Sequence, residues 1–311
     1  MKLGVFIPGR LSSERLPQKL ILPLGESCLW EIACKKLNEL PEKYNKYVLC
    51  YDQELIDIAK KYSNIKIIIR DKKTANAEGP LKYIFKDLKN VEDTHLMFLN
   101  PCLSFLSKDT IIEALEKFEK SYCDYGTSVK PIQNWLFTDT GENLNDINYE
   151  RLTTKEIGPI WEAAHCFHIF DKKKFFKDGL MLKKGHLLIS VPKKETIDVD
   201  TPEDYEYAKY RHKKKYVIDI DGTICDLPKG CIDYSKAEPI KEKIERFNNL
   251  YDGGNTIVYF TARGYETGID WRDVTEQQFK KWGVKYHNLI FGKPSADIYI
   301  GDKMYNVTDI V

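Results

Sequence analysis

Short apolar runs alternate with segments of helical spacing along this chain, and that alternation limits its fold more than any other feature. Leu3–Ile7 and Ile65–Ile69 have the composition of strands, whereas Leu29–Leu40 repeats apolar residues at helical intervals. Regular strand–helix alternation favours an α/β fold in which helices flank a mainly parallel sheet. Such sheets bind ligands in the loops that follow the carboxyl ends of their strands.

A basic run at Arg211–Lys215 separates this alternation from a second one. Such a run is typical of a solvated helix end or a linker. We therefore predict two α/β domains, residues 1–212 and residues 213–311, each a mainly parallel sheet flanked by helices. In the second domain the expected strands are Tyr216–Ile220, Thr256–Phe260, Asn288–Phe291 and Ala296–Ile300, and the expected helices are Ile240–Tyr251 and Thr275–Trp282.

Charge and cysteine usage narrow the class of protein. The 311 residues carry a net charge of +1, so no global field attracts nucleic acid or an anionic membrane. No window holds the ~18 apolar residues of a membrane span, and the first apolar run is too short for a signal peptide. The eight cysteines form no C-x-x-C pair, which fits buried thiols in a reducing compartment. We expect a soluble, cytoplasmic protein that acts on small molecules, without nucleic-acid or membrane partners.

The loop after the first expected strand concentrates cations and hydrogen-bond donors. Arginine offers a planar fork to phosphate oxygens and lysine a point charge. The loop lacks the G-x-x-x-x-G-K-[ST] pattern of a P-loop. It is therefore either a solvated basic loop or a site for a polyanion such as a triphosphate. The candidate binding residues are Pro8, Gly9, Arg10, Ser12, Ser13, Arg15 and Lys19.

An acidic segment near residue 200 allows two interpretations. Asp198 and Asp200 alternate along an extended stretch, so both carboxylates face one side while Val199 points to the other. Paired carboxylates are ligands that Mg²⁺ takes in proteins. The sequence Asp200-Thr201-Pro202-Glu203 also reads as the start of a helix, which would make Asp200 an N-cap.

These motifs resemble those of cytidylyltransferases that activate sugars such as Kdo and sialic acid. The similarity spans about residues 1–211 and includes IPGRLSSERLPQK, PLGESCLWEIACKKL and ETIDVDTPEDYEYA. It implies a nucleotidyltransferase Rossmann-like fold, CTP held by the opening loop, Arg15 and Lys19 in catalysis, and Mg²⁺ on Asp198 and Asp200. Nucleotidyl transfer needs charge neutralisation and alignment rather than a protein nucleophile, which agrees with these residue types.

Two segments bear on the acceptor. Kdo-type enzymes place a metal-binding aspartate after the fourth strand, where this chain has Asn100 and Cys102; the uncharged sialic-type pattern is closer. The stretch Trp161–His168 could shape an acceptor pocket. His165 and His168 within it are either buried, hydrogen-bonded strand residues or acceptor contacts.

The last third of the chain places polar groups after four expected strands. Asp219 and Asp221 end the first and are followed by Gly-Thr. Thr261, Lys293 and Asp302 follow the other three. Aspartates at the end of a buried strand are costly unless a cation compensates them.

This set resembles the four motifs of the haloacid dehalogenase (HAD) phosphatase superfamily, over about residues 214–311. The resemblance implies a HAD-like fold with Asp219 as nucleophile, Asp221 as general acid and base, Thr261 and Lys293 holding the phosphoryl group, and Mg²⁺ on Asp219, Asp221 and Asp302. The short spacings leave no room for a cap domain. Expected substrate contacts are Arg263, Tyr265, Glu266, Trp271 and Arg272.

We therefore predict a bifunctional, Mg²⁺-dependent enzyme. One domain transfers CMP from CTP to a sugar, sugar phosphate or polyol phosphate and releases pyrophosphate. The other hydrolyses a phosphate monoester, and both serve surface (capsular) polysaccharide precursor synthesis. Two alternatives stay open: a cytidylyltransferase whose second domain is silent and used for oligomerisation, and a protein that binds nucleotide sugars without catalysis. A homo-oligomer is expected.

Overall fold

A computed structural model describes the chain except for residues 76–78, 148, 152, 156–157, 159 and 307–311. The chain forms two compact units. The first contains Met1–Leu22 and Cys28–Tyr205, and the second contains Pro23–Ser27 and Glu206–Val311. The short segment Pro23–Ser27 thus leaves the first unit, an excursion that no local pattern indicated. None of the described helices combines the length and the apolar content that crossing a bilayer requires.

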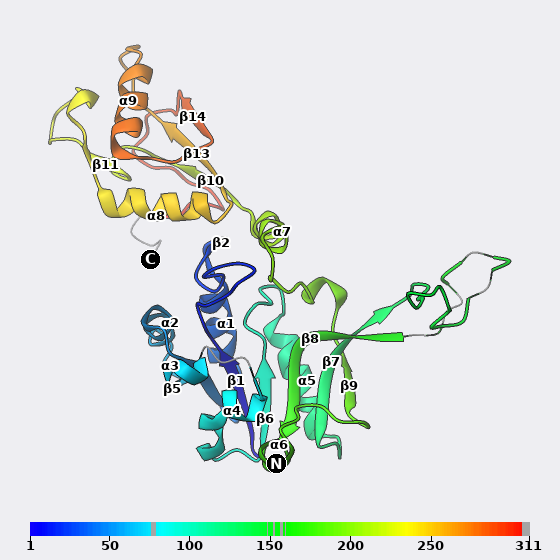
Figure 1. The fold of residues 1–311 in the computed structure, drawn as a ribbon. Coiled ribbons are helices and arrows are strands. Elements are labelled where there is room, and N and C mark those ends of the chain that lie inside the picture. The colour runs from blue at the N-terminus through cyan, green and yellow to red at the C-terminus, as the bar shows by residue number, and fades with distance from the viewer. Residues whose placement is uncertain (76–78, 148, 152, 156–157, 159, 307–311) are drawn as a thin grey trace. The chain divides into compact units, whose positions relative to one another are not determined.

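The first unit is built on a seven-stranded, mainly parallel sheet (Figure 1), in the order β5-β4-β1-β6-β8-β7-β9. Only β8 runs antiparallel to its neighbours. The α/β class predicted from strand–helix alternation is confirmed for this unit. The strands are β1 Leu3–Pro8, β4 Asn45–Cys50, β5 Lys66–Ile69, β6 His95–Leu99, β7 Tyr125–Ile132, β8 Ile160–Asp171 and β9 Leu187–Ser190.

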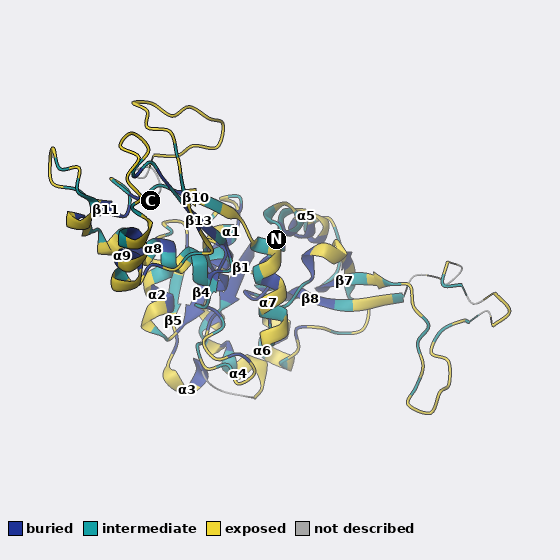
Figure 2. Ribbon diagram, turned by 90° about the horizontal axis from the view of Figure 1, so that it is seen from above, coloured by how far each residue is buried: buried dark blue, intermediate teal, exposed yellow. Residues whose placement is uncertain are grey.

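Helices flank this sheet, and their apolar stripes explain the helical spacing in the sequence. In α1, residues such as Trp30 and Leu37 are fully buried. The sheet interior is correspondingly dark blue in Figure 2, whereas the outer faces of the helices are yellow. The helices are α1 Leu29–Asn38, α2 Gln53–Ala59, α3 Lys72–Ala75, α4 Leu81–Ile84, α5 Lys108–Glu119 and α6 Lys172–Asp178, with 3₁₀ turns η1 Lys86–Asn90 and η2 Lys193–Glu195. Helix α7, Pro202–His212, contains the point where the second unit begins.

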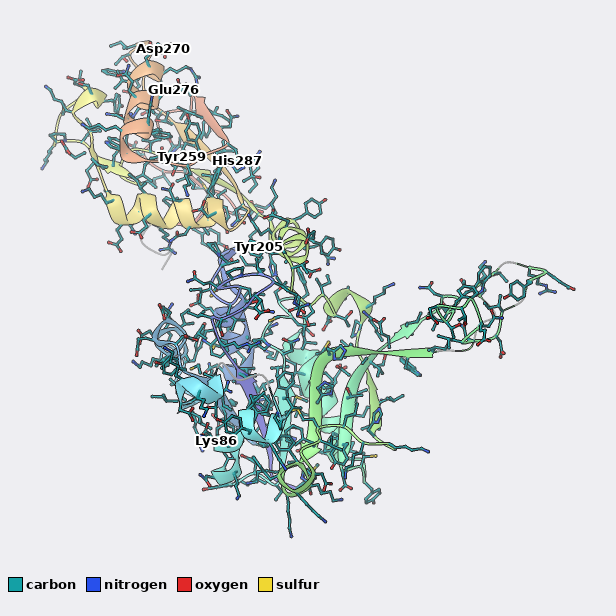
Figure 3. All side chains as sticks on the ribbon, in the orientation of Figure 1. Lys86, Tyr205, Tyr259, Asp270, Glu276 and His287 are labelled. Atoms are coloured by element: carbon teal, nitrogen blue, oxygen red, sulfur yellow. The ribbon has the colours of Figure 1, made fainter. Side chains whose placement is uncertain are left out.

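The second unit contains a three-stranded parallel sheet in the order β10-β13-β14. Its core centres on Tyr259 (Figure 3), whose ring packs edge-on against Phe279 at 4.9 Å between centroids. The elements are β10 Lys215–Ile218, β11 Cys225–Asp226, η3 Tyr234–Lys236, β12 Glu238–Pro239, α8 Lys241–Asp252, β13 Thr256–Thr261, α9 Arg272–Trp282 and β14 Asn288–Phe291.

The expected strand Ala296–Ile300 does not form. The segment is irregular, and Ile298 and Ile300 are 75% and 94% exposed. The prediction rested on an apolar run, but such a run becomes a strand only where a neighbouring strand accepts its hydrogen bonds. In the described residues this segment has no such neighbour.

The excursion Pro23–Ser27 contributes the two-residue strand β2, Pro23–Leu24, and the first residue of the two-residue strand β3, Ser27–Cys28. Within the second unit, Gly25 donates its backbone N–H to Gly253 and accepts a 2.7 Å bond from the Asn255 side chain. Glu26 pairs with Lys214 at 3.0 Å. A Cβ on Gly253 would lie 2.4 Å from the Gly25 carbonyl oxygen, so the close approach requires glycine there.

Candidate functional site

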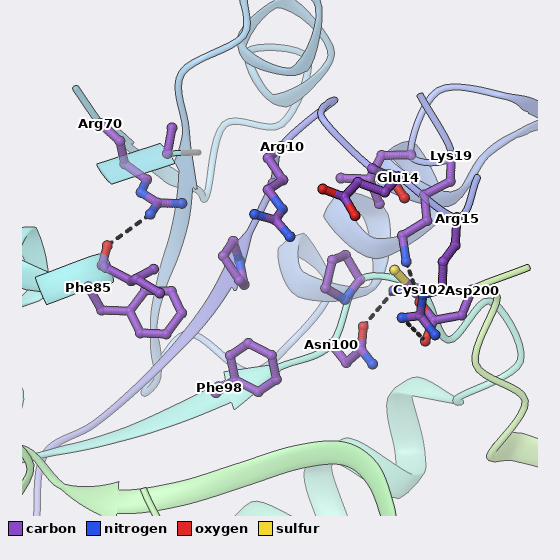
Figure 4. A pocket seen from close by; sticks show the side chains of 17 residues that line it. Arg10, Glu14, Arg15, Lys19, Arg70, Phe85, Phe98, Asn100, Cys102 and Asp200 are labelled. Atoms are coloured by element: carbon purple, nitrogen blue, oxygen red, sulfur yellow. Dashed lines mark hydrogen bonds and ion pairs between the residues drawn. The ribbon is translucent and has the colours of Figure 1, made fainter. Parts of the chain in front are cut away.

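A pocket of about 630 Å³ lies in the first unit where β1, β5 and β6 end (Figure 4). The loop after β1 supplies most of one wall and the segment 98–102 supplies another. The pocket has a charged end with Arg15, Lys19 and Asp200, and an aromatic end with Phe85 and Phe98. It therefore lies at the carboxyl ends of parallel strands, as expected for this class of sheet.

Two cations of the opening loop converge on one carboxylate. The Lys19 Nζ lies 2.6 Å from Asp200 Oδ1, and the Arg15 Nη2 lies 2.9 Å from Asp200 Oδ2. Burial alone would raise the pKa of Asp200, but the bond from Lys19 and the charges of both cations lower it. Burial alone would lower the pKa of Lys19, but Cys102 and Asp200 outweigh it and raise that pKa. Lys19 and Asp200 therefore keep their charges at neutral pH.

Asp200 is not the N-cap of α7. Thr201 takes that role, because its hydroxyl accepts the backbone N–H of Asp204. In return the Asp204 carboxylate accepts the backbone N–H groups of Asp200 and Thr201. This reciprocal capping leaves the side chain of Asp200 directed to the cations.

Asp198 lies beside this cluster, and only one of its two carboxylate oxygens accepts a hydrogen bond from the described residues. Its Oδ2 accepts a 2.9 Å bond from Asn100, while its Oδ1 is buried and has no hydrogen-bond partner in the described part of the chain. Burial, followed by the charge of Asp200, raises the pKa of Asp198. Val199 between them is fully buried, as alternation predicts.

The donor set fits Mg²⁺ in this pocket. Mg²⁺ is usually held by one or two carboxylates, with the remaining positions filled by waters and substrate phosphates. Asp198, beside the pocket, has a buried oxygen without a partner among the described residues, and Asp200 would become a second carboxylate ligand once substrate phosphates draw Lys19 and Arg15 away from it. Among the described residues there is no group of three or more His, Cys, Asp or Glu side chains placed to hold a metal alone.

The opening loop is shaped by its own contacts. A Cβ on Gly9 would lie 2.7 Å from the Trp30 ring, so any larger residue would clash where the loop leaves β1. The Leu11 backbone N–H bonds to Asp52 at 3.0 Å. The residues that line the pocket from this loop are Pro8, Gly9, Arg10, Ser13, Glu14, Arg15, Lys19 and Leu20. Ser12 is exposed and does not line it.

Arg70 is a pocket residue that sequence reasoning missed. It follows β5, is 3% exposed, and donates a 2.9 Å bond to the Ile84 carbonyl. Its guanidinium lies over the Phe85 ring, 5.8 Å from the centroid. Its Nε is buried and lacks a partner among the described residues. The available signal was one arginine placed directly after the β-branched run Ile65–Ile69.

The two histidines of β8 have different surroundings. A bulge shifts the β7–β8 register opposite Ser128, whose hydroxyl accepts the backbone N–H groups of Cys166 and Phe167. His165 lies in this bulge with a left-handed φ of 52°, and its carbonyl accepts a 3.2 Å bond from Asn100. His168 bonds to Thr127 at 2.9 Å, and burial lowers the pKa of His168 to about 4. His168 is thus a hydrogen-bonded strand residue, whereas His165 is exposed beside the pocket wall.

In the second unit, three predicted site residues come together. Lys293 Nζ lies 2.6 Å from Asp219 Oδ2, and the Lys293 backbone N–H bonds to the Thr261 carbonyl. Asp302 does not join them. It is exposed on the irregular segment after β14, and no described hydrogen bond or ion pair links it to Asp219 or Asp221. The missing strand at 296–300 explains this, because that strand was expected to deliver Asp302 to the sheet edge.

Arg263 is not poised for a substrate, contrary to prediction. It is 3% exposed and clamps Asp221 through Nε and Nη2 at 2.9 and 2.8 Å. Its Nη1 bonds to Gln278 at 2.8 Å, and the guanidinium lies over the Tyr234 ring. A buried arginine with its donors engaged orients the carboxylate it binds.

Comparison with known proteins relates the chain to cytidylyltransferases. The family model described as "Cytidylyltransferase" matches residues 5–257. A pseudaminic acid cytidylyltransferase of Campylobacter jejuni is 24% identical over 229 residues, covering 68% of this chain and 97% of that protein. A 3-deoxy-manno-octulosonate cytidylyltransferase of Rickettsia bellii is 25% identical over 132 residues, covering 42% and 53%. The solved 4-diphosphocytidyl-2C-methyl-D-erythritol synthase of Anaerococcus prevotii has a TM-score of 0.49 and 13% identity, covering 67% and 97%.

Proposed function

The chain belongs to the cytidylyltransferase family, and we propose that it transfers CMP from CTP to an acidic sugar and releases pyrophosphate. The observation that carries this proposal is the convergence of Arg15 and Lys19 on Asp200 at the charged end of the pocket. These cations are opposite in sign to a triphosphate and offset part of its charge, and Asp200 keeps them paired until phosphate oxygens compete for them.

The residues of the pocket would act by neutralisation and alignment. An acceptor oxygen attacks the α-phosphorus, and the bond to pyrophosphate breaks. Arg10, Arg15 and Lys19 would offset the charge of the phosphates and orient them for in-line attack. Asp198 and Asp200 would hold Mg²⁺, which offsets further phosphate charge when bound.

The nucleoside would occupy the other end of the pocket. Phe85 and Phe98 supply apolar faces there, and Arg70 has a buried N–H donor without a partner among the described residues. An unpaired donor at an aromatic wall suits the carbonyl oxygen of a pyrimidine. We propose that this contact favours cytosine over adenine, which has no carbonyl oxygen.

The acceptor would approach beside Asn100 and His165. The relatives named above act on pseudaminic acid and 3-deoxy-manno-octulosonate, both acidic sugars, which supports a CMP-linked product. A sugar or polyol phosphate acceptor, giving a CDP-linked product, is the alternative. We further propose that the product is a precursor for surface polysaccharide synthesis. We also propose that the protein is a homo-oligomer, which light scattering after gel filtration tests.

Pyrophosphate release tests the transferase proposal. Purified protein is incubated with Mg²⁺, each of four NTPs, and acceptors of three kinds: 2-keto sugar acids, sugar phosphates and polyol phosphates. We expect release with CTP and a keto acid, and its loss in Lys19→Met but not in Lys35→Met, an exposed lysine on α1. CTP binding without release from any acceptor would favour a binding protein instead.

We propose a second activity, phosphate monoester hydrolysis by the second unit. The ion pair between Lys293 and Asp219 favours it, because a carboxylate beside a lysine at a strand end can attack a phosphorus atom whose charge the lysine offsets. The P–O ester bond would break as the Asp219–P bond forms, and solvent water would give the leaving oxygen its proton, because Asp221, expected to be the general acid, is engaged by Arg263. Water would then hydrolyse the acyl phosphate.

The described residues of the second unit do not assemble a Mg²⁺ site. Asp219 is paired with Lys293, Asp221 with Arg263, and Asp302 lies apart from both. We therefore assign no step there to a metal. Hydrolysis of p-nitrophenyl phosphate by wild type, Asp219→Asn and the exposed control Asp226→Asn tests the activity. Equal inactivity of all three proteins would favour a silent second unit.

A further inference from the structure

Lys36 of α1 occupies a cage of backbone oxygens. Its Nζ donates to the carbonyls of Leu103, Ser104 and Leu106 at 2.8, 3.2 and 2.9 Å. Those three residues belong to the irregular loop that follows β6 and are each at least nine-tenths buried. Carbonyls in a buried loop need donors, and an ammonium has three N–H groups for the three of them.

This contact is not an ion pair. No described salt bridge includes Lys36, although Glu195 contributes a favourable charge from η2. Glu195 binds the same loop at its end, where it accepts the Ser107 backbone N–H at 2.9 Å. Two residues from different elements, Lys36 of α1 and Glu195 of η2, therefore bind the backbone of this loop.

The first part of the same loop, residues 100–102, lines the pocket. Asn100 binds Asp198, and its Oδ1 accepts the backbone N–H of Cys102. The Cys102 carbonyl in turn accepts the Val199 N–H at 3.2 Å. The segment that carries both candidate metal ligands is thus tied to the loop that Lys36 holds.

We propose that Lys36 is a positioning residue for nucleotidyl transfer: by holding the carbonyls of residues 103–106, it fixes Asn100 and Cys102 against Asp198. This proposal rests on the transferase function proposed above. Lys36 touches no pocket space and acts only through the loop, so its loss should reduce alignment more than nucleotide binding.

The cage also makes the loop sensitive to pH. Burial lowers the pKa of Lys36 to about 8, and the facing titratable groups, Glu195 from η2 and Cys166 from β8, oppose this only in part. The neutral amine has two N–H groups for three carbonyls. Activity should therefore decline above about pH 8, and arginine, which stays charged, should move that decline upward.

Three variants test the proposal: Lys36→Met, Lys36→Arg and the control Lys35→Met. Hydrogen exchange of the peptide spanning residues 100–107, followed by mass spectrometry, reads loop order without any need for activity. We expect at least tenfold faster exchange in Lys36→Met, wild-type exchange in Lys35→Met, at least a tenfold lower kcat, and a KM for CTP within threefold of wild type.

Lys36→Arg should keep slow exchange and shift the alkaline limb of kcat up by at least one pH unit. Wild-type exchange and kcat in Lys36→Met, or equal losses in Lys35→Met, would overturn the proposal. If Lys36→Met does not fold, an unshifted alkaline limb in Lys36→Arg would overturn it. If hydrogen exchange is faster in Lys36→Met but the wild type is inactive on every acceptor, the transferase function is refuted. Lys36 would then have only the structural role of holding the loop.

Discussion

Replacing Asp198 by asparagine should move stability and activity in opposite directions. The new side chain keeps an oxygen to accept the 2.9 Å bond from Asn100. It removes a charge from a partly buried position next to Asp200, where one carboxylate oxygen is buried and has no partner among the described residues. The change is therefore nearly isosteric, and its effect on folding comes mainly from the lost charge.

The expected gain in stability is small but measurable. An unsatisfied buried polar group costs about 1–3 kcal/mol, and more if charged. The amide nitrogen that Asp198→Asn introduces would itself be buried without an acceptor, which cancels part of the gain. We therefore expect about 1 kcal/mol, or about 2–4 °C in the Tm of the first unit.

The effect of Asp198→Asn on stability should depend on pH in a definite direction. The pKa of Asp198 is raised in the folded state, so the folded protein binds its proton more tightly than the unfolded chain. Stability from this group is present at low pH and falls as pH rises through the folded pKa. The stabilisation by Asp198→Asn should thus be seen at neutral pH and vanish in acid.

Activity should fall by at least 100-fold in kcat/KM, about 2.7 kcal/mol of transition-state free energy, because a proposed Mg²⁺ ligand is lost. Thermal unfolding without CTP and Mg²⁺ gives the stability, and pyrophosphate release at increasing Mg²⁺ gives the activity. Glu203→Gln, an exposed acid in the first turn of α7, is the control. A variant that is both less stable and fully active would refute this reasoning.

Three further outcomes follow from the structure. Lys19→Met should lower kcat/KM for transfer at least 100-fold, yet leave phosphate monoester hydrolysis unchanged; a parallel fall in both activities would contradict separate sites. His168→Gln should make stability less dependent on pH in acid, measured by urea unfolding. Partly buried His168 has a pKa of about 4 in the folded protein, so wild type loses at most about 3 kcal/mol of stability as pH falls from the unfolded pKa to that value. Arg263→Met should destabilise the second unit by about 3 kcal/mol, since Asp221 would lose its cation; an unchanged unfolding midpoint would show that the clamp is dispensable.

The sheet of the first unit could be predicted from local patterns of apolar residues. Central strands such as β1 are buried on both faces, so they are continuous apolar runs, and α1 shows its buried stripe at helical intervals. The spacing of cations after β1 also pointed to the loop that the structure places at the pocket. These features depend on neighbours in the chain, which the sequence displays directly.

Features that depend on distant partners were not predictable in this way. Arg70 looks in sequence like any cation that follows a strand, and its place in the pocket depends on Phe85 and Ile84. Arg263 was placed correctly after β13, but its burial depends on contacts with residues such as Gln278. The run 296–300 is apolar enough for a strand, yet nothing local shows whether another strand pairs with it.

The excursion of Pro23–Ser27 has a practical consequence for dissecting the molecule. A fragment that stops at Tyr205 would keep this segment but discard Gly253 and Asn255, which satisfy the backbone of Gly25. The orphaned peptide groups would lie only a few positions after Lys19 in the chain. Simple truncation is therefore a poor way to isolate the amino-terminal half, and a short replacement turn between Leu22 and Cys28 is the sounder route.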